Sequence, residues 1–114
     1  MNILDNAKKH FDEISGTLRK IEVPEWGDES GPAVIYAKPM NMVQKSEVIA
    51  LVNADKMGES LFLKIFHMAR NESGTRQFKR TDSDTFLKEV DPDVMSTIAM
   101  KLDSELNDEK IRKN

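Results

Sequence analysis

The side chains that most often bind metal ions or carry out catalysis are sparse in this chain. The sequence contains two histidines, His10 and His67, and no cysteine. His10 and Asp12 form a His-x-Asp spacing, but a zinc site needs three or four ligands. Because no cysteine can complete such a set, both histidines are interpreted as surface or boundary residues. We expect no metal site and no cofactor.

Acidic residues occur in several close pairs, which raises the question of general acid catalysis. A carboxyl group serves as a general acid where burial raises its pKa. Asp82, Asp84 and Asp91 instead stand before helical segments, where an aspartate caps a helix and remains solvated. The sequence also lacks a G-x-S-x-G motif and a glycine-rich phosphate loop. We therefore expect the protein not to be an enzyme.

A short basic patch, formed by Arg76, Lys79 and Arg80, lies near Phe78. The formal net charge of the 114-residue chain is −3, whereas non-specific nucleic-acid binding needs clustered lysine and arginine. The patch is interpreted as a solvated turn, with contact to RNA or an acidic partner as the alternative. We expect no nucleic-acid partner, and a small nucleic-acid-binding or regulatory protein remains the alternative function.

Composition and length indicate a soluble cytoplasmic protein. A chain of this length suffices for one core. No apolar run approaches the roughly 20 residues that span a bilayer, and the N-terminus lacks the continuous apolar segment of a secretion signal. The absence of cysteine fits a reducing compartment. The sequence therefore predicts no contact with a membrane.

Hydrophobic spacing predicts an amphipathic helix over residues 3–14, followed by a β-hairpin. Its strands are TLRKIEV and AVIYAK, joined by a long loop, PEWGDESGP. Asn41 and Gln44 fit a capping box at the start of the next helix. Gly58 separates that helix from ESLFLKIFHMAR, whose strong apolar face marks the central core helix.

The second half of the chain is predicted to be mainly helical. Gly74 suits a left-handed turn, and a short helix carries Phe86 and Leu87. Asp91 and Pro92 begin the last helix. The expected fold class is α+β: a small, mostly helical domain with about four to five helices and one antiparallel β-hairpin. We expect a single domain over residues 1–106 and a polar, frayed tail over 107–114.

Aromatic and methionine side chains are the candidates for recognition of a partner. Trp26 is the single tryptophan and Tyr36 the single tyrosine. Tryptophan is enriched in binding hot spots but also closes cores, so both roles stay open for Trp26. The seven methionines suit either core gaps or adaptable contact surfaces. The predicted partner-binding residues are Trp26, Tyr36, Leu63, Met68 and Met100.

The order of these segments resembles the tail assembly chaperones of long-tailed, siphovirus-type bacteriophages and prophages. The resemblance rests on IEVPEWG, VIYAKPMN, LFLKIFHMAR, NESGTRQF and DSDTFLKEVDPDVMSTIAMKL, and it spans about residues 3–106. Asn71, Gly74 and Phe78 fit the family's D-x-x-G-x-x-x-F pattern, with Asn71 where the family often has aspartate. Asp82 or Asp84, with Leu87, fits its acidic turn and short helix.

The resemblance implies a non-enzymatic chaperone that acts in the host bacterial cytoplasm and is not part of the mature virion. Its client would be the tape measure protein, a long, helical and aggregation-prone chain that it keeps soluble during tail assembly. The resemblance further implies self-association and, through a frameshifted longer form, contact with the tail tube protein. A holdase of this kind needs exposed apolar surface with a polar rim.

Overall fold

The computed structural model describes residues 2–112, with side chains described through Asp103. Within this part, the chain forms five α-helices and a three-stranded antiparallel sheet, which confirms the predicted α+β class. The helices are α1 (Ile3–Ser15), α2 (Met42–Asn53), α3 (Met57–Met68), α4 (Ser83–Glu89) and α5 (Pro92–Arg112), with a short 3₁₀ turn η1 (Arg80–Asp82) before α4. The strands are β1 (Arg19–Asp28), β2 (Gly31–Ala37) and β3 (Ala69–Arg70).

The sheet has the order β1-β2-β3, and each neighbouring pair is antiparallel. Ile35 and Ala37 of β2 face the core, together with Ile21 and Val23 of β1. This alternation of buried and less buried residues follows the two-residue period of a strand. The two-residue strand β3 is not predicted by the sequence, since AR continues the helical pattern of α3.

The prediction of a long hairpin loop between the strands is wrong, because β1 continues to Asp28. Ser30 closes the short turn by donating its backbone N–H and its hydroxyl to Asp28 Oδ1, at 2.9 and 2.6 Å. The register shifts between Val23 and Asp28, so this end of the hairpin is irregular. Gly27 permits the close approach: a Cβ there would lie 2.2 Å from the backbone oxygen of Gly31.

Helix α3 is the central core helix, as the sequence predicts. It packs against α2, α4 and α5, and α5 also lies against β1. Ile65 is fully buried. The rings of Phe62 and Phe66 stack, with their centroids 6.2 Å apart. The buried face of α5 completes the core with Val94, Met95, Ile98, Ala99 and Leu102.

The break between α2 and α3 lies earlier than predicted. Gly58 belongs to the first turn of α3, and the chain turns instead at Asp55, whose φ is 60°. Aspartate tolerates this left-handed conformation better than most residues. At the other end of α2, the predicted capping box is present: Asn41 Oδ1 accepts from Gln44 N, and Gln44 Oε1 accepts from Asn41 N.

The C-terminal prediction falls partly outside the described residues. Helix α5 runs to Arg112, so the backbone of residues 107–112 is helical. The fraying of this tail stays a prediction. Nothing is described of the side chains of residues 104–112 or of residues 113–114.

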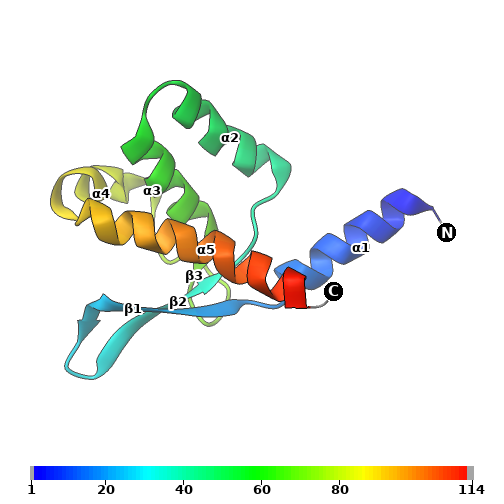
Figure 1. Cartoon of the computed structure of the whole chain (residues 1–114), viewed down its shortest axis with the longest axis horizontal. Helices are drawn as coiled ribbons and strands as arrows, with labels where there is room; N and C mark the ends of the chain where they lie inside the picture. The colour runs from blue at the N-terminus through cyan, green and yellow to red at the C-terminus, as the bar shows by residue number, and fades with distance from the viewer. Residues whose placement is uncertain (1, 113–114) are drawn as a thin grey trace.

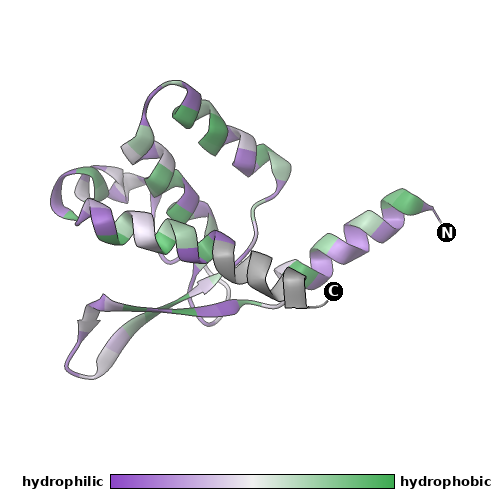
Figure 2. Cartoon of the chain, in the orientation of Figure 1, coloured by the Kyte–Doolittle hydropathy of each residue, from purple (hydrophilic) through white to green (hydrophobic). Residues whose placement is uncertain are grey.

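Helix α1 projects away from the helices and the sheet (Figure 1). None of its residues is buried. Figure 2 shows hydrophobic and hydrophilic positions alternating along this projecting helix and along α2. Most helical stability in proteins comes from packing of an apolar face. Helices α1 and α2 carry most of the large apolar side chains that are exposed among the described residues.

Candidate protein-binding surface

Large apolar side chains lie exposed on α1 and α2. The described residues include nine such side chains, and six of them belong to these two helices: Ile3, Leu4, Met42, Val43, Ile49 and Val52. Single exposed apolar residues are ordinary, whereas a contiguous group indicates an interaction site. The concentration on α2 is therefore the starting point for a candidate site.

Helix α2 has apolar residues on both its inner and its outer side. Val48 and Leu51 pack against the core cluster on the inner side. Met42, Ile49 and Val52 occupy an outer flank, at spacings of seven and three that bring them onto one side of a helix, and Met42 is 71% exposed. A helix that is apolar on several sides is normally buried. Here the outer flank lacks a cover within the described part of the chain.

A groove runs beside this flank, with a volume of about 370 Å³. We call it the α2 groove, and its lining residues are Met40, Lys45, Val48, Ile49, Lys64 and Asp103. Lys64 of α3 and Asp103 of α5 form an ion pair at its charged edge. The groove thus combines apolar side chains from α2 with a polar rim, the composition expected of a site that receives an amphipathic helix.

A cluster of ionisable side chains lies where α2 packs on α3. His67 is buried, and its Nε2 lies 3.4 Å from Glu47 Oε1 on α2. Its Nδ1 lies 3.4 Å from Arg76 Nη1. Burial lowers the pKa of His67 below its ordinary value of 6.5, Glu47 acts in the opposite direction, and Arg76 and Arg80 lower it further. The net shift favours the neutral form of the imidazole near neutral pH.

Acidification is expected to destabilise the fold through His67. Because the pKa of His67 is lower in the folded than in the unfolded chain, the unfolded state binds more protons just below pH 6.5. The free energy of unfolding should fall as the pH drops from 7.5 to 5.5, as measured by urea denaturation. His67→Gln should lose most of this pH dependence, while His10→Gln, on the exposed α1, should retain it. Equal wild-type stability at both pH values would contradict the assignment.

The apolar side of α1 forms a second uncovered surface. Leu4, Ala7, Phe11 and Ile14 recur at alternating spacings of three and four, the pattern of a coiled-coil seam. We call these four residues, with Ile3, the α1 stripe. Phe11 and Ile14 are half-buried near the root of the helix, and Ile3 and Leu4 are exposed at its far end.

Trp26 packs the hairpin against the helical part of the molecule. Its half-buried ring makes edge-to-face contacts with Phe78 and Phe86, at centroid distances of 6.4 and 5.9 Å. Tyr36 alternates with the buried Ile35 and Ala37, so it lies on the other face of the sheet, opposite Arg70 of β3. The structure does not bring Trp26 and Tyr36 together as one site.

Leu63, Met68 and Met100, the other predicted partner-binding residues, differ sharply in exposure. Leu63 and Met68 belong to the core, at 8% and 2% exposed. A partner that docks on the outside of the folded protein would not reach the side chains of Leu63 and Met68. Met100 on α5 is 66% exposed and remains available for contact.

The basic patch predicted at residues 76–80 is partly engaged within the protein. Arg76 and Arg80 both lie over the Phe66 ring, with guanidinium carbons 4.3 and 4.9 Å from its centroid. Arg80 Nη2 also lies 3.7 Å from Glu47 Oε2. The exposed Lys79 stands beside them.

Sequence reasoning missed the α2 groove, although the sequence holds a signal for it. The apolar residues of α2 exceed what one inward stripe needs: Val48 and Leu51 supply that stripe, and Met42 and Ile49 are surplus.

The described residues contain no group of three or more metal-ligating side chains. Among those same residues, no helix combines the length and the hydrophobicity that crossing a membrane requires. Comparisons with protein-family models, with curated proteins and with solved structures found no match to this chain.

Proposed function

We propose that this protein is a tail assembly chaperone of a phage or prophage, and that it binds and solubilises the tape measure protein without catalysing a reaction. The identity of the client rests on the sequence resemblance. The mode of binding rests on one structural observation, the uncovered apolar flank of α2 beside the α2 groove.

The α2 groove suits an amphipathic helix as its occupant. Apolar side chains of the client would pack on Met40, Val48 and Ile49, and its polar residues would meet Lys45 and the Lys64–Asp103 pair at the rim. A helix seated in this way buries one stripe and leaves its other side in water. Repeated modest contacts of this kind cover a long helical client and still permit its release.

The surface around the groove keeps such a complex soluble. Charged residues make up 32% of the chain, with both signs present. A charged, mixed surface opposes the non-specific association that exposed apolar patches promote. When the protein covers the client's apolar stripe, the complex therefore presents a hydrophilic surface in place of one that aggregates.

Self-association belongs to the same proposal, with the α1 stripe as its contact surface. Alternating spacings of three and four let two copies of α1 pack along one seam, and small Ala7 alternates with larger side chains. Multi-angle light scattering should then give a mass above 13.0 kDa for the chain alone. A monomer at all concentrations would remove this part of the proposal.

Co-expression with a phage tape measure protein tests the function. We expect the client to remain in the supernatant after high-speed centrifugation and to co-purify with the tagged chaperone. The client expressed alone should pellet. A client that pellets equally in both cultures would contradict the proposal, as would a soluble client that never co-purifies.

A further inference from the structure

The side chains along the α1 stripe differ in size, and their order favours one orientation for two packed copies of α1. The seam consists of Leu4, Ala7, Phe11 and Ile14. In a parallel pair each residue meets its own copy, so two Phe11 rings crowd one layer and two Ala7 methyl groups underfill another. In an antiparallel pair Ala7 meets Phe11 and Leu4 meets Ile14, which gives layers of similar volume. Dense packing without voids or strain requires such a combination of large and small side chains.

Two charged residues beside the stripe favour the same orientation. Lys8 and Asp12 are both exposed, and they lie on one flank of the stripe because they are about one helical turn apart. In an antiparallel pair this flank meets the same flank of the other copy in reverse order. Lys8 of each copy then comes near Asp12 of the other. In a parallel pair Lys8 would instead face Ile3 on the opposite flank.

The way in which α1 leaves the fold also distinguishes the two orientations. The helix projects from the sheet and the other helices, and its N-terminal end lies furthest from them (Figure 1). An antiparallel pair places the remainder of each copy at opposite ends of the two helices. A parallel pair would bring both copies to the same end, where they compete for one space.

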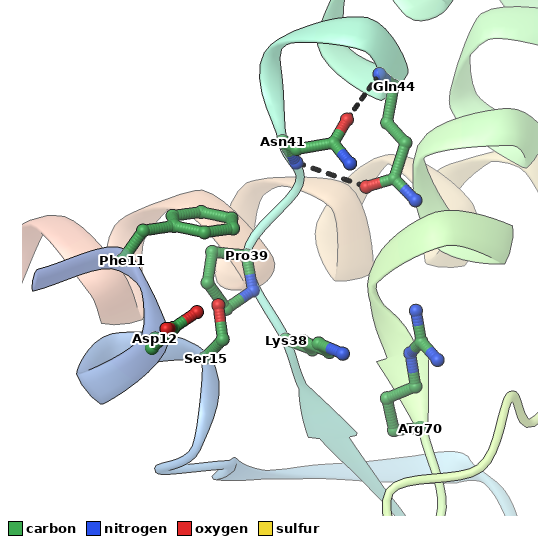
Figure 3. A pocket seen from close by; sticks show the side chains of 8 residues that line it. All are labelled: Phe11, Asp12, Ser15, Lys38, Pro39, Asn41, Gln44 and Arg70. Carbon is green, nitrogen blue, oxygen red and sulfur yellow. Dashed lines mark hydrogen bonds between the residues drawn. The ribbon is translucent and has the colours of Figure 1, made fainter. Parts of the chain in front are cut away.

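A pocket at the base of α1 lies where the far end of a second, antiparallel α1 would arrive. Its volume is about 190 Å³, and Phe11, Asp12, Ser15 and Pro39 are among its lining residues. Figure 3 shows these four residues on the same side of residues 38–41, with the Phe11 ring extending toward Pro39. Leu4 of the second copy would come level with the last turn of α1, beside this surface. The pocket therefore offers room and apolar contact to the first turn of that helix.

We propose, building on the self-association proposed above, that two copies of this protein pair through antiparallel α1 helices about a two-fold axis. Each copy places the first turn of its α1 at the base of the other's. A two-fold contact of this kind uses the same surface on both copies, so it closes as a dimer and does not extend into a filament. One dimer then presents two separate α2 grooves to a long client, which raises the overall affinity without a new contact.

Disulfide formation between single-cysteine variants tests the orientation. The chain contains no cysteine, so each crosslink reports on the introduced residues alone. Leu4→Cys and tagged Ile14→Cys, equilibrated together in a glutathione redox buffer, should form mainly the mixed disulfide on a non-reducing gel. Leu4→Cys alone should form little, because its two copies lie roughly 15 Å apart along the pair, beyond the reach of a disulfide. Lys88→Cys, exposed on α4, controls for random crosslinking.

The crosslinks distinguish the orientation of α1 from self-association itself. Self-linked Leu4→Cys would indicate a parallel pair and overturn the proposal, while self-association would stand. A dimer mass by light scattering without the mixed disulfide would place the contact elsewhere and also overturn it. A monomer would remove both, whereas client capture is measured separately by co-expression. If Ile14→Cys does not fold, Ala7→Cys mixed with Phe11→Cys tests the other layer in the same way.

Charge reversal on α1 gives an independent test by sedimentation equilibrium. Lys8→Glu should raise the dissociation constant of the dimer roughly ten-fold, because two attractive contacts per dimer become repulsive. Lys9→Glu makes the same change on the side of α1 away from the stripe and should leave the constant nearly unchanged. Lys8→Glu combined with Asp12→Lys should restore it. Equal weakening by Lys8→Glu and Lys9→Glu would overturn the proposed pairing.

Discussion

Ile49→Asp is expected to abolish capture of the helical client while the chaperone itself stays folded. Ile49 is 47% exposed on α2, so the folded chain loses little by the exchange. In the proposed complex, however, the same side chain would lie against the apolar stripe of the client. An unpaired carboxylate buried there costs several kcal/mol, which corresponds to roughly a hundred-fold loss of affinity or more. Co-purification with the client, beside a thermal melt of the free chain, measures both effects.

Ala50→Asp is the matched control for this substitution. It places the same charge on the same helix, one residue further, away from the flank of Met42, Ile49 and Val52. Capture should persist in this variant. Loss of capture in both variants, or in neither, would show that the α2 groove is not the client site.

Gly27→Ala is expected to destabilise the protein more than any surface substitution. The three atoms nearest to its Cβ would all be backbone atoms, with Gly31 O at 2.2 Å, Pro32 Cα at 2.7 Å and Ala33 N at 2.9 Å. The two strands must therefore separate at the irregular end of the hairpin. Overpacking of this kind costs about 1–3 kcal/mol, and each kcal/mol lowers the melting temperature by roughly 4–8 °C in a domain near this size. Because Trp26 is the neighbouring residue and the one tryptophan, its fluorescence reports the local change.

Gly58→Ala makes the same chemical change with a different expected result. There the Cβ would meet Leu87 Cδ2 at 2.9 Å, the end of a flexible and partly exposed side chain. Alanine also favours a helix over glycine by about 1 kcal/mol. We expect little net change in the melting temperature. Comparable destabilisation by both variants would contradict the role given to Gly27.

Most helices are predictable from the sequence because their signals are local. The α2 capping box and the apolar face of α3 depend on residues a few positions apart, and the structure confirms both. The hairpin turn was misplaced because proline and two glycines suggest a loop, while the close approach at Gly27 depends on the partner strand. Strand β3 was missed for a similar reason: its two residues gain strand geometry only by pairing with Tyr36 and Ala37.

The candidate sites are less predictable, because exposure depends on the whole fold. Helical spacing does not reveal that Leu63 and Met68 face the core whereas Ile49 faces solvent. Met100 is the predicted contact residue whose side chain is largely exposed.

The central claim is that the exposed flank of α2 binds the client. The most direct test is methyl nuclear magnetic resonance of the protein labelled at its methionine and isoleucine methyl groups, titrated with a soluble helical fragment of the tape measure protein. The exposed flank and the core carry methyl groups of both types, so they are compared in one spectrum. We predict large shifts at Met42 and Ile49 and none at Ile65, Met68 or Ile98. If the Met42 and Ile49 signals do not shift at a saturating concentration of the client fragment, the account is contradicted.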